Sequence, residues 1–292
     1  MLKTATEGSK TAAATTPTRL RQIALVTDDL EKARRQLTYV IGTEIIYEDP
    51  EVAQWGLKNI LVPLGGDIIE VVSPFKSDTT AGRLLQKRGE GGYMIIMQTY
   101  DAAHRRDMIR SRNLAKVIWE YNHGDGLAVQ YHPKAAKGGT MVEIDSHSVT
   151  AQNPTPLQTR FSPWHACGTD YKRYSSFMKR YSHLSLQGCV LRVSPGDLAQ
   201  EDALRQWGEV FGVARSGDAL AFTNARLRFI AGEEGENEGL VSVTVGVRDK
   251  GKLRDILDRA REEGVCRDGV VNICGVKWLF VLTDPEEETS RL

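Results

Sequence analysis

The hydrophobic pattern of the chain repeats four times. Each repeat opens with an apolar run, passes through a turn containing Asp or Pro into a segment with helical spacing, and closes with a second apolar run. The opening runs are 23–26, 94–97, 190–193 and 243–247, and the closing runs are 68–72, 141–144, 227–230 and 278–281. This order of strand, helix and further strands predicts an α+β fold made of four βαβββ units.

The spacing of the repeats predicts how the units combine. One unit cannot bury its own sheet face, so we expect the four to pair into two cupped mixed-sheet domains. Gln22 and Met94 open the first two units 72 residues apart, and Glu70 and Glu143 close them 73 residues apart. The predicted organisation is a disordered tail at 1–17, domains at 18–148 and 185–284, a Pro-, Tyr-, Ser- and Trp-rich linker at 149–184, and a tail at 285–292.

The composition of the chain argues against several classes of protein. Lys plus Arg and Asp plus Glu are both 38, and this zero formal charge argues against a nucleic-acid or anionic-membrane partner. No apolar run approaches the roughly 18 residues of a membrane helix, and the N-terminal residues contain no signal-like apolar region. The four cysteines form no CxxC pair and suit reduced core thiols, so we expect a cytoplasmic protein.

Three segments carry a resemblance to a known family. They are Gln22 to Leu30 (QIALVTDDL), Gly66 to Glu70 (GDIIE) and Thr80 to Gly92 (TAGRLLQKRGEGG). The sequence resembles the vicinal oxygen chelate superfamily, which includes glyoxalase I, extradiol dioxygenases and bleomycin-resistance proteins. The third segment is most similar to the methylmalonyl-CoA epimerase branch, and the likeness is weaker over 185–284.

The resemblance implies a candidate site in the first cup. Family members commonly hold a divalent metal there, with side chains from the first and last strand of each unit. The matching positions are Gln22, Glu70, Met94 and Glu143. The two glutamates suit metal ligands or general bases and Gln22 offers a carbonyl oxygen, but the thioether of Met94 is a poor ligand for a hard cation. We therefore expect weak or absent metal binding in this cup.

The equivalent positions of the second half are Cys189, Arg228, Ser242 and Leu279. They form no metal-binding set, and we expect the second domain to be structural. It would stand in for a second subunit or complete the assembly, and a homodimer is one expected assembly.

Several other residues allow two interpretations. His132 is either a catalytic acid or base, or a strand-end residue before a proline. Tyr93 and Trp55 either line the pocket or belong to the core. Trp164 and His165 either cap the cup or pack between the halves. Arg83, Lys87 and Arg88 either meet an anionic substrate or form a solvated helix face.

These observations leave two hypotheses for function. The first is a glyoxalase-like enzyme, a lyase, isomerase or epimerase that uses Glu70 and Glu143 on a small oxygen-rich substrate. The second is a metal-free small-molecule-binding protein of the bleomycin-resistance kind. The buried glutamates favour the enzyme, whereas Gln22 and Met94 favour the binding protein.

Overall fold

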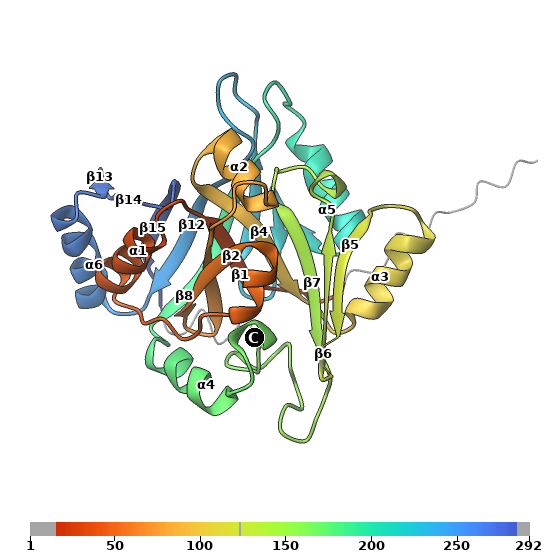
Figure 1. Ribbon diagram of the computed structural model, residues 1–292, viewed down its shortest axis with the longest axis horizontal. Helices are drawn as coiled ribbons and strands as arrows, with labels where there is room; N and C mark the ends of the chain where they lie inside the picture. Colours follow the sequence, from red (N-terminus) through yellow and green to blue (C-terminus); the bar gives the residue numbers. More distant parts are fainter. Residues whose placement is uncertain (1–15, 123, 285–292) are drawn as a thin grey trace, which may run out of the picture.

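The computed structural model describes residues 16–122 and 124–284, and the fold contains the predicted four βαβββ units (Figure 1). The N-terminal tail therefore lies outside the described residues except for Thr16 and Pro17, and so does the C-terminal tail. The units form two mixed sheets, one of seven strands and one of eight. The predicted α+β architecture of two paired sheets is confirmed.

The first sheet contains the first two units. The first unit comprises strand β1 (Arg19–Val26), helices α1 (Leu30–Arg35) and η1 (Gln36–Ile41), a single bridge at Tyr47, the short helix η2 (Pro50–Trp55), and strands β2 (Leu57–Leu64) and β3 (Asp67–Pro74). The second comprises β4 (Gly91–Gln98), α3 (Ala102–Ser111), β5 (Val117–Asn122), β6 (Gly126–Tyr131), η3 (Pro133–Ala135) and β7 (Met141–His147). Helix α2 (Thr80–Arg88) joins the two units.

The second sheet repeats this plan. Its units comprise β8 (Leu184–Arg192), α5 (Gln200–Phe211), β9 (Ala214–Ser216), β10 (Ala219–Ala221) and β11 (Arg226–Ile230), followed by β12 (Gly239–Val247), α6 (Lys250–Glu262), β13 (Cys266–Arg267), β14 (Val270–Ile273) and β15 (Val276–Leu282). The strand orders are β2-β3-β1-β4-β7-β6-β5 and β9-β10-β11-β8-β12-β15-β14-β13. They correspond from β2 and β10 onward, and β9 takes the place of the single bridge at Tyr47. In both sheets the first strands of the two units pair antiparallel, and each pairs parallel with the last strand of its own unit.

Aspartates start three of the four repeat helices. Asp29, Asp101 and Asp249 each accept a hydrogen bond from a backbone N–H one turn into the helix, at 2.8–2.9 Å. A side-chain oxygen in this position satisfies a helix-end donor that has no partner in the helix. The Asp-containing turns in the sequence are therefore helix N-caps.

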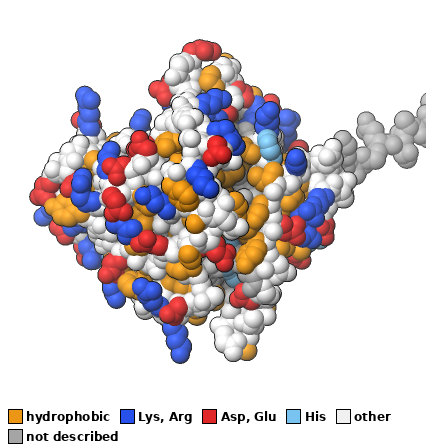
Figure 2. Space-filling model, in the orientation of Figure 1, with side chains coloured by type: hydrophobic (Ala, Val, Ile, Leu, Met, Phe, Trp, Pro, Cys, Tyr) orange, Lys and Arg blue, Asp and Glu red, His pale blue; other side chains and the backbone are white. Residues whose placement is uncertain are grey.

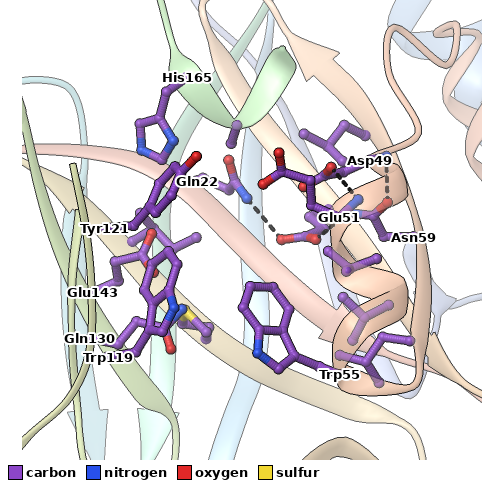
Figure 3. A pocket seen from close by; sticks show the side chains of 18 of the residues that line it. Gln22, Asp49, Glu51, Trp55, Asn59, Trp119, Tyr121, Gln130, Glu143 and His165 are labelled. Atoms are coloured by element: carbon purple, nitrogen blue, oxygen red, sulfur yellow. Dashed lines mark hydrogen bonds between the residues drawn. The ribbon is translucent and has the colours of Figure 1, made fainter. Parts of the chain in front are cut away.

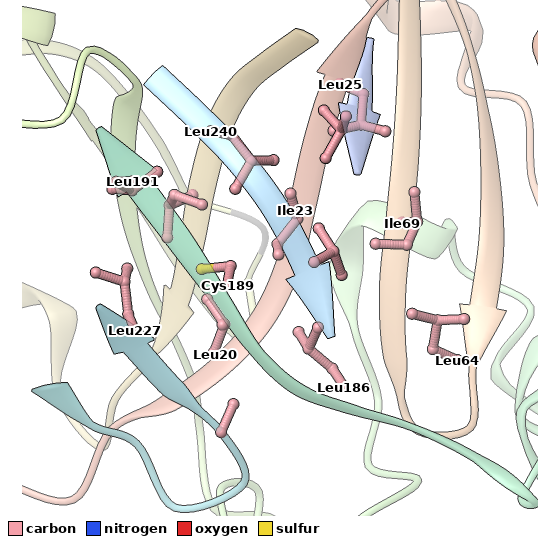
Figure 4. Close-up of a cluster of buried hydrophobic side chains, with 14 of the residues drawn as sticks. Leu20, Ile23, Leu25, Leu64, Ile69, Leu186, Cys189, Leu191, Leu227 and Leu240 are labelled. Carbon is pink, nitrogen blue, oxygen red and sulfur yellow. The ribbon is translucent and has the colours of Figure 1, made fainter. Parts of the chain in front are cut away.

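The two sheets pack against each other through a continuous apolar core (Figure 4). Ile23, Leu25 and Ile69 of the first sheet contribute to it, as do Cys189 and Leu191 of the second. The helices lie at the sides, α1 beside α6 and α3 beside α5 (Figure 1). This packing leaves the opposite face of the first sheet, the concave side, available for a site.

A glycine lies at a close contact between the two sheets. A Cβ atom built on Gly92 of β4 would lie 2.3 Å from the Cβ of Leu240 on β12. Any larger residue at Gly92 would push the two sheets apart, so the glycine is required by packing between the halves.

The stretch between the sheets is folded onto the first cup. It contains η4 (His165–Cys167) and α4 (Tyr171–Arg180), and it buries Trp164, Cys167, Tyr174 and Met178 against a second apolar cluster. That cluster lies on the concave face, where Ala24, Ile68 and Met94 contribute from the strands. The stretch predicted as a linker therefore also forms part of the cup.

The described residues contain no helix that is long and apolar enough to cross a membrane. Figure 2 looks onto the side of the molecule that carries the first cup, where acidic and basic side chains are interspersed and apolar side chains are exposed near the centre.

Candidate functional site

The concave face of the first sheet encloses a cavity of about 1020 Å³ (Figure 3). Both units of the sheet contribute to its lining, and the stretch between the sheets contributes residues 163–174. In the view of Figure 3, Trp119, Tyr121 and Glu143 lie on one side, and Asp49, Glu51 and Asn59 on the other. The candidate site is therefore shared among three segments that are distant in sequence.

The structure brings together most of the residues selected from the sequence. Those lining the cavity are Gln22, Glu70, Met94, Glu143, Tyr93 and Trp55. His132 is not among the lining residues. Its Nδ1 atom accepts a hydrogen bond from the backbone N–H of Lys134 at the start of η3, so we assign it no role in the site.

Two amide groups hold Glu70 on β3. Gln22 Nε2 donates to one carboxylate oxygen at 2.9 Å, and Asn59 Nδ2 donates to the other at 2.6 Å. Burial raises the pKa of Glu70, while these two hydrogen bonds oppose the rise because they stabilise the ionised form. These two donors make Glu70 better supported as an anion than a buried carboxylate without partners would be.

The orientation of Gln22 is fixed from the stretch between the sheets. The indole Nε1 of Trp164 donates to Gln22 Oε1 at 2.7 Å, so the amide must present its nitrogen to Glu70. Trp164 is itself fully buried, and its backbone N–H donates to the Tyr174 hydroxyl at 3.0 Å. The guanidinium of Arg21 lies 5.3 Å from the centre of the indole ring, close enough for a cation–π interaction.

Strand β7 brings a second group of titratable side chains to the cup. Glu143, Asp145 and His147 alternate along the strand and therefore share its concave face, and the first two are 5 % and 0 % exposed. Burial raises the pKa of Glu143 well above its ordinary value, and the neighbouring Asp145 raises it further. Glu143 therefore favours its protonated form more strongly than Glu70 does.

His165 faces this group from the stretch between the sheets. Its Nε2 lies 2.5 Å from Asp145 Oδ2, a separation that requires one proton between the two atoms. Burial lowers the pKa of His165 to about 4 and raises that of Asp145 well above its ordinary value. With one proton between the two atoms, the pair carries no net charge.

The four family positions do not fit a metal ion. Gln22 Oε1 is occupied by the Trp164 indole, both oxygens of Glu70 accept amide hydrogen bonds, and the fourth position is the thioether of Met94. Among the described residues, a different group brings suitable atoms together. Glu143, Asp145 and His165 each offer one ligand atom, all within 4.8 Å of one another.

Sequence reasoning missed three lining or supporting residues. Asp145 and His147 were detectable, because alternation along a strand places them on the same face as Glu143. Asn59 gave no signal, since its role depends on the pairing of β2 with β3. The structure also decides between the two interpretations of Trp164 and His165, which both lie on the first cup.

The second sheet presents no comparable cluster among its described residues. Arg228 is exposed and pairs with Asp218 at 3.1 Å, and Leu279 is 36 % exposed. Cys189, expected at a cup position, lies instead in the core between the sheets, because the neighbouring Val190 pairs with Arg228 and Ser242. A difference of one residue in register reverses the face on which a strand side chain lies.

Comparisons with known proteins agree with this architecture. No protein-family model matches the chain. The mitochondrial methylmalonyl-CoA epimerase of Bos taurus is 28 % identical over 131 residues, which cover 44 % of this chain, in its N-terminal half, and 73 % of the bovine protein. A solved hypothetical protein from Staphylococcus aureus superimposes with a TM-score of 0.57 over 91 % of this chain and 100 % of its own, at 12 % identity.

The N-terminal half is thus similar in sequence to a methylmalonyl-CoA epimerase, and the paired-sheet fold agrees with the predicted resemblance to vicinal oxygen chelate proteins. A further solved structure is similar to about half of this chain. It is a Streptomyces coelicolor methylmalonyl-CoA epimerase variant in complex with 2-nitronate-propionyl-CoA, 20 % identical, with a TM-score of 0.40, covering 46 % of this chain and 99 % of that one.

Proposed function

We propose that the first cup catalyses an isomerase or epimerase reaction, in which a proton is removed from a carbon next to a carbonyl group and returned. The similarity of the N-terminal half to methylmalonyl-CoA epimerase supports this class of reaction. The observation that carries the proposal is the contrast between Glu70 and Glu143. Two carboxyl groups in one cavity, of which Glu143 has its pKa raised well above the ordinary value while two amide donors oppose the rise at Glu70, suit a general acid and a general base.

The strand order places the two glutamates on either side of the site. Glu70 on β3 and Glu143 on β7 are separated by β1 and β4, which corresponds to about 14 Å between the outer strands. The concave curvature of the sheet turns both side chains toward one cavity. A small substrate between them would expose opposite faces of its reacting carbon to the two groups.

The proton transfers balance as follows. The Glu70 carboxylate accepts the proton of the substrate C–H bond, and the electron pair of that bond moves into the carbonyl group as an enolate. The Glu143 carboxylic acid then donates its proton to the opposite face of the carbon, and the carbonyl re-forms. Glu70 is left protonated and Glu143 ionised, and proton exchange with solvent or the reverse reaction restores the starting state.

Two neighbouring groups support these steps. Burial, together with the charges of Glu70 and Glu143, raises the pKa of Tyr93, so its hydroxyl stays protonated and can donate a hydrogen bond to the enolate oxygen. The Asp145–His165 pair beside Glu143 holds a further proton and can return one to Glu143 after it has reacted.

Proton exchange from solvent tests the proposal. The protein would be incubated in D₂O with a panel of small carbonyl compounds that carry an α-hydrogen, and loss of the α-proton signal would be followed by NMR. We expect exchange into at least one compound, abolished by Glu70→Gln and retained in Arg228→Ala. A protein that binds members of the panel and exchanges no proton would contradict the proposal and support the alternative, a small-molecule-binding protein, which the ill-fitting metal positions Gln22 and Met94 favour.

A further inference from the structure

The cavity is strongly acidic, although the chain as a whole is neutral. Of the described residues that line it, six carry a carboxyl group, of which Glu143 favours its neutral form, while Arg83 supplies the one guanidinium and no lysine contributes. The carboxylates are Asp49, Glu51, Glu70, Asp78, Asp125 and Glu143. None of the six forms a salt bridge to an Arg or Lys among the described residues.

The acidic side chains come from both units of the first sheet, and their charges act on the same part of the cavity, near His165. The charges of Asp125, which follows β5, and Asp49, which precedes η2, both bear on His165. Glu51 follows Asp49 on η2, and Glu70 and Glu143 lie on the strands of the cup floor. A ligand in the cavity therefore meets negative potential from several directions.

The basic residues of helix α2 do little to offset this charge. Arg83 donates hydrogen bonds to the backbone carbonyl of Asp78 and to the Thr80 hydroxyl of its own segment. Arg88 turns toward the second half of the chain, where it pairs with Glu238. Lys87 is exposed and is not among the lining residues. Of these three residues only Arg83 lines the cavity, where its single positive charge is outnumbered by the carboxyl groups.

Three aromatic side chains, from β5 on one side of the cavity and η2 on the other, form an aromatic wall (Figure 3). The rings of Trp119 and Tyr121 on β5 stack with centres 5.7 Å apart, and Trp55 on η2 packs edge-on against Trp119 at the same distance. Trp55 is 42 % and Tyr121 39 % exposed, although both are large aromatic residues. Exposed aromatic rings beside carboxylates are the groups that bind organic ammonium ions, through cation–π and Coulomb attraction.

We propose that the first cup binds an organic cation, so that the substrate of the reaction inferred above carries an ammonium group. The statement about the substrate rests on the proposed function, because it assumes that a reaction takes place in the cup. The statement that a cation binds does not, because it depends only on the residues that line the cavity. The carboxylates and the aromatic wall select the positive charge, while Glu70 and Glu143 face the reacting carbon. An acyl-CoA, which carries several phosphate charges, would be repelled by the same groups.

A pair of isosteric probes tests the charge requirement. Choline and 3,3-dimethylbutan-1-ol have the same shape, and the second replaces the positive nitrogen by carbon. Binding to the full chain would be followed by calorimetry and by tryptophan fluorescence. We expect choline to bind at least tenfold more tightly than the neutral alcohol, and its affinity to fall as salt is raised. Equal affinity for the two probes would overturn the proposal.

Variants identify where the cation binds. We expect Trp119→Leu, and separately Glu51→Gln combined with Asp125→Asn, to weaken choline binding at least fivefold. Matched controls are Tyr100→Leu, which removes an exposed aromatic ring outside the cavity, and Asp218→Asn, which removes a carboxylate on the second sheet. Choline binding weakened equally by the controls would place the cation elsewhere and overturn the inference.

Propionyl-CoA separates this inference from the proposed function. Tighter binding of propionyl-CoA than of choline, lost in Trp119→Leu, would overturn the cationic ligand while leaving the isomerase proposal intact. Choline binding that meets the expectations above, in a protein that exchanges no substrate proton, would support the cationic ligand and refute the isomerase proposal.

Discussion

The indole nitrogen of Trp164 donates a 2.7 Å hydrogen bond to the side-chain oxygen of Gln22, 142 positions away in the sequence. This contact fixes the direction of the Gln22 amide, whose nitrogen donates to Glu70 at 2.9 Å. A residue from the stretch between the two sheets thereby sets the hydrogen bonding of a glutamate on the floor of the cup. It also occupies the oxygen that a metal would need at Gln22.

Replacing Trp164 by Phe should disturb the site through Gln22. The buried oxygen of Gln22 would lose its donor, at a cost of about 1–3 kcal/mol in the free energy of unfolding. The amide could then turn, and the pKa of Glu70 should rise because it loses a donor. Denaturant unfolding and the pH dependence of proton exchange measure these effects.

Trp207→Phe is the matched control for this prediction. Trp207 is also fully buried, and its Nε1 donates to the carbonyl of Lys137 at 2.9 Å, away from the cavity. The Trp207→Phe variant should lose a similar amount of unfolding free energy, and the pH dependence of its proton exchange should not shift. A profile unchanged in Trp164→Phe would show that the indole does not position Gln22.

Removal of either glutamate's carboxyl group should abolish turnover. Glu70→Gln loses the group that accepts the substrate proton, and Glu143→Gln loses the group that donates one, so proton exchange should fall by at least 100-fold in each. The fold should remain, as shown by circular dichroism. Arg228→Ala and Ser242→Ala, on the second sheet, should keep near wild-type exchange. Activity that survives in both glutamate variants and disappears in Arg228→Ala would move the site to the second half.

Glu143→Gln should stabilise the protein at neutral pH. Burial raises the pKa of Glu143 in the folded state, so the folded state binds more protons than the unfolded state above the ordinary carboxyl range. Wild-type stability contributed by this group is present below about pH 4 and is lost as pH rises toward the folded-state pKa. The Glu143→Gln variant should not lose this stability as pH rises, because its amide does not ionise.

Unfolding free energies of both proteins between pH 4 and pH 8 measure the effect. The advantage of Glu143→Gln should be near zero at the acidic end and reach about 1–3 kcal/mol at the neutral end. Wild-type and variant curves that stay parallel over this range would show that the Glu143 carboxyl does not hold its proton in the folded state.

Metal binding at Gln22, Glu70, Met94 and Glu143 should require histidines in place of Gln22 and Met94. We expect Gln22→His combined with Met94→His to bind Co²⁺ stoichiometrically, with a visible absorption band, because nitrogen ligands would then join Glu70 and Glu143. The wild type should bind Co²⁺ weakly or not at all there, since the Trp164 indole and the amides occupy the oxygens of Gln22 and Glu70.

Asp145→Asn and Glu70→Gln separate the two candidate metal positions in the wild-type background. Tight wild-type metal lost in Asp145→Asn and kept in Glu70→Gln would place the ion between Glu143, Asp145 and His165. Tight metal lost in Glu70→Gln would contradict the expectation for the family positions.

The sequence by itself determined the repeating units and the strands that carry the site. Apolar runs and helix-capping aspartates are local signals, and equal spacing aligned Gln22 with Met94 and Glu70 with Glu143 before any contact was known. Tertiary structure decided what those residues can do. Trp164 donates to Gln22 across 142 positions of the sequence, so this contact depends on how the whole chain folds. Asn59 donates to Glu70, and this contact depends on the pairing of β2 with β3. The same holds for the acidic cavity, because a chain with no net charge can concentrate carboxylates in one place only through the way its segments fold together.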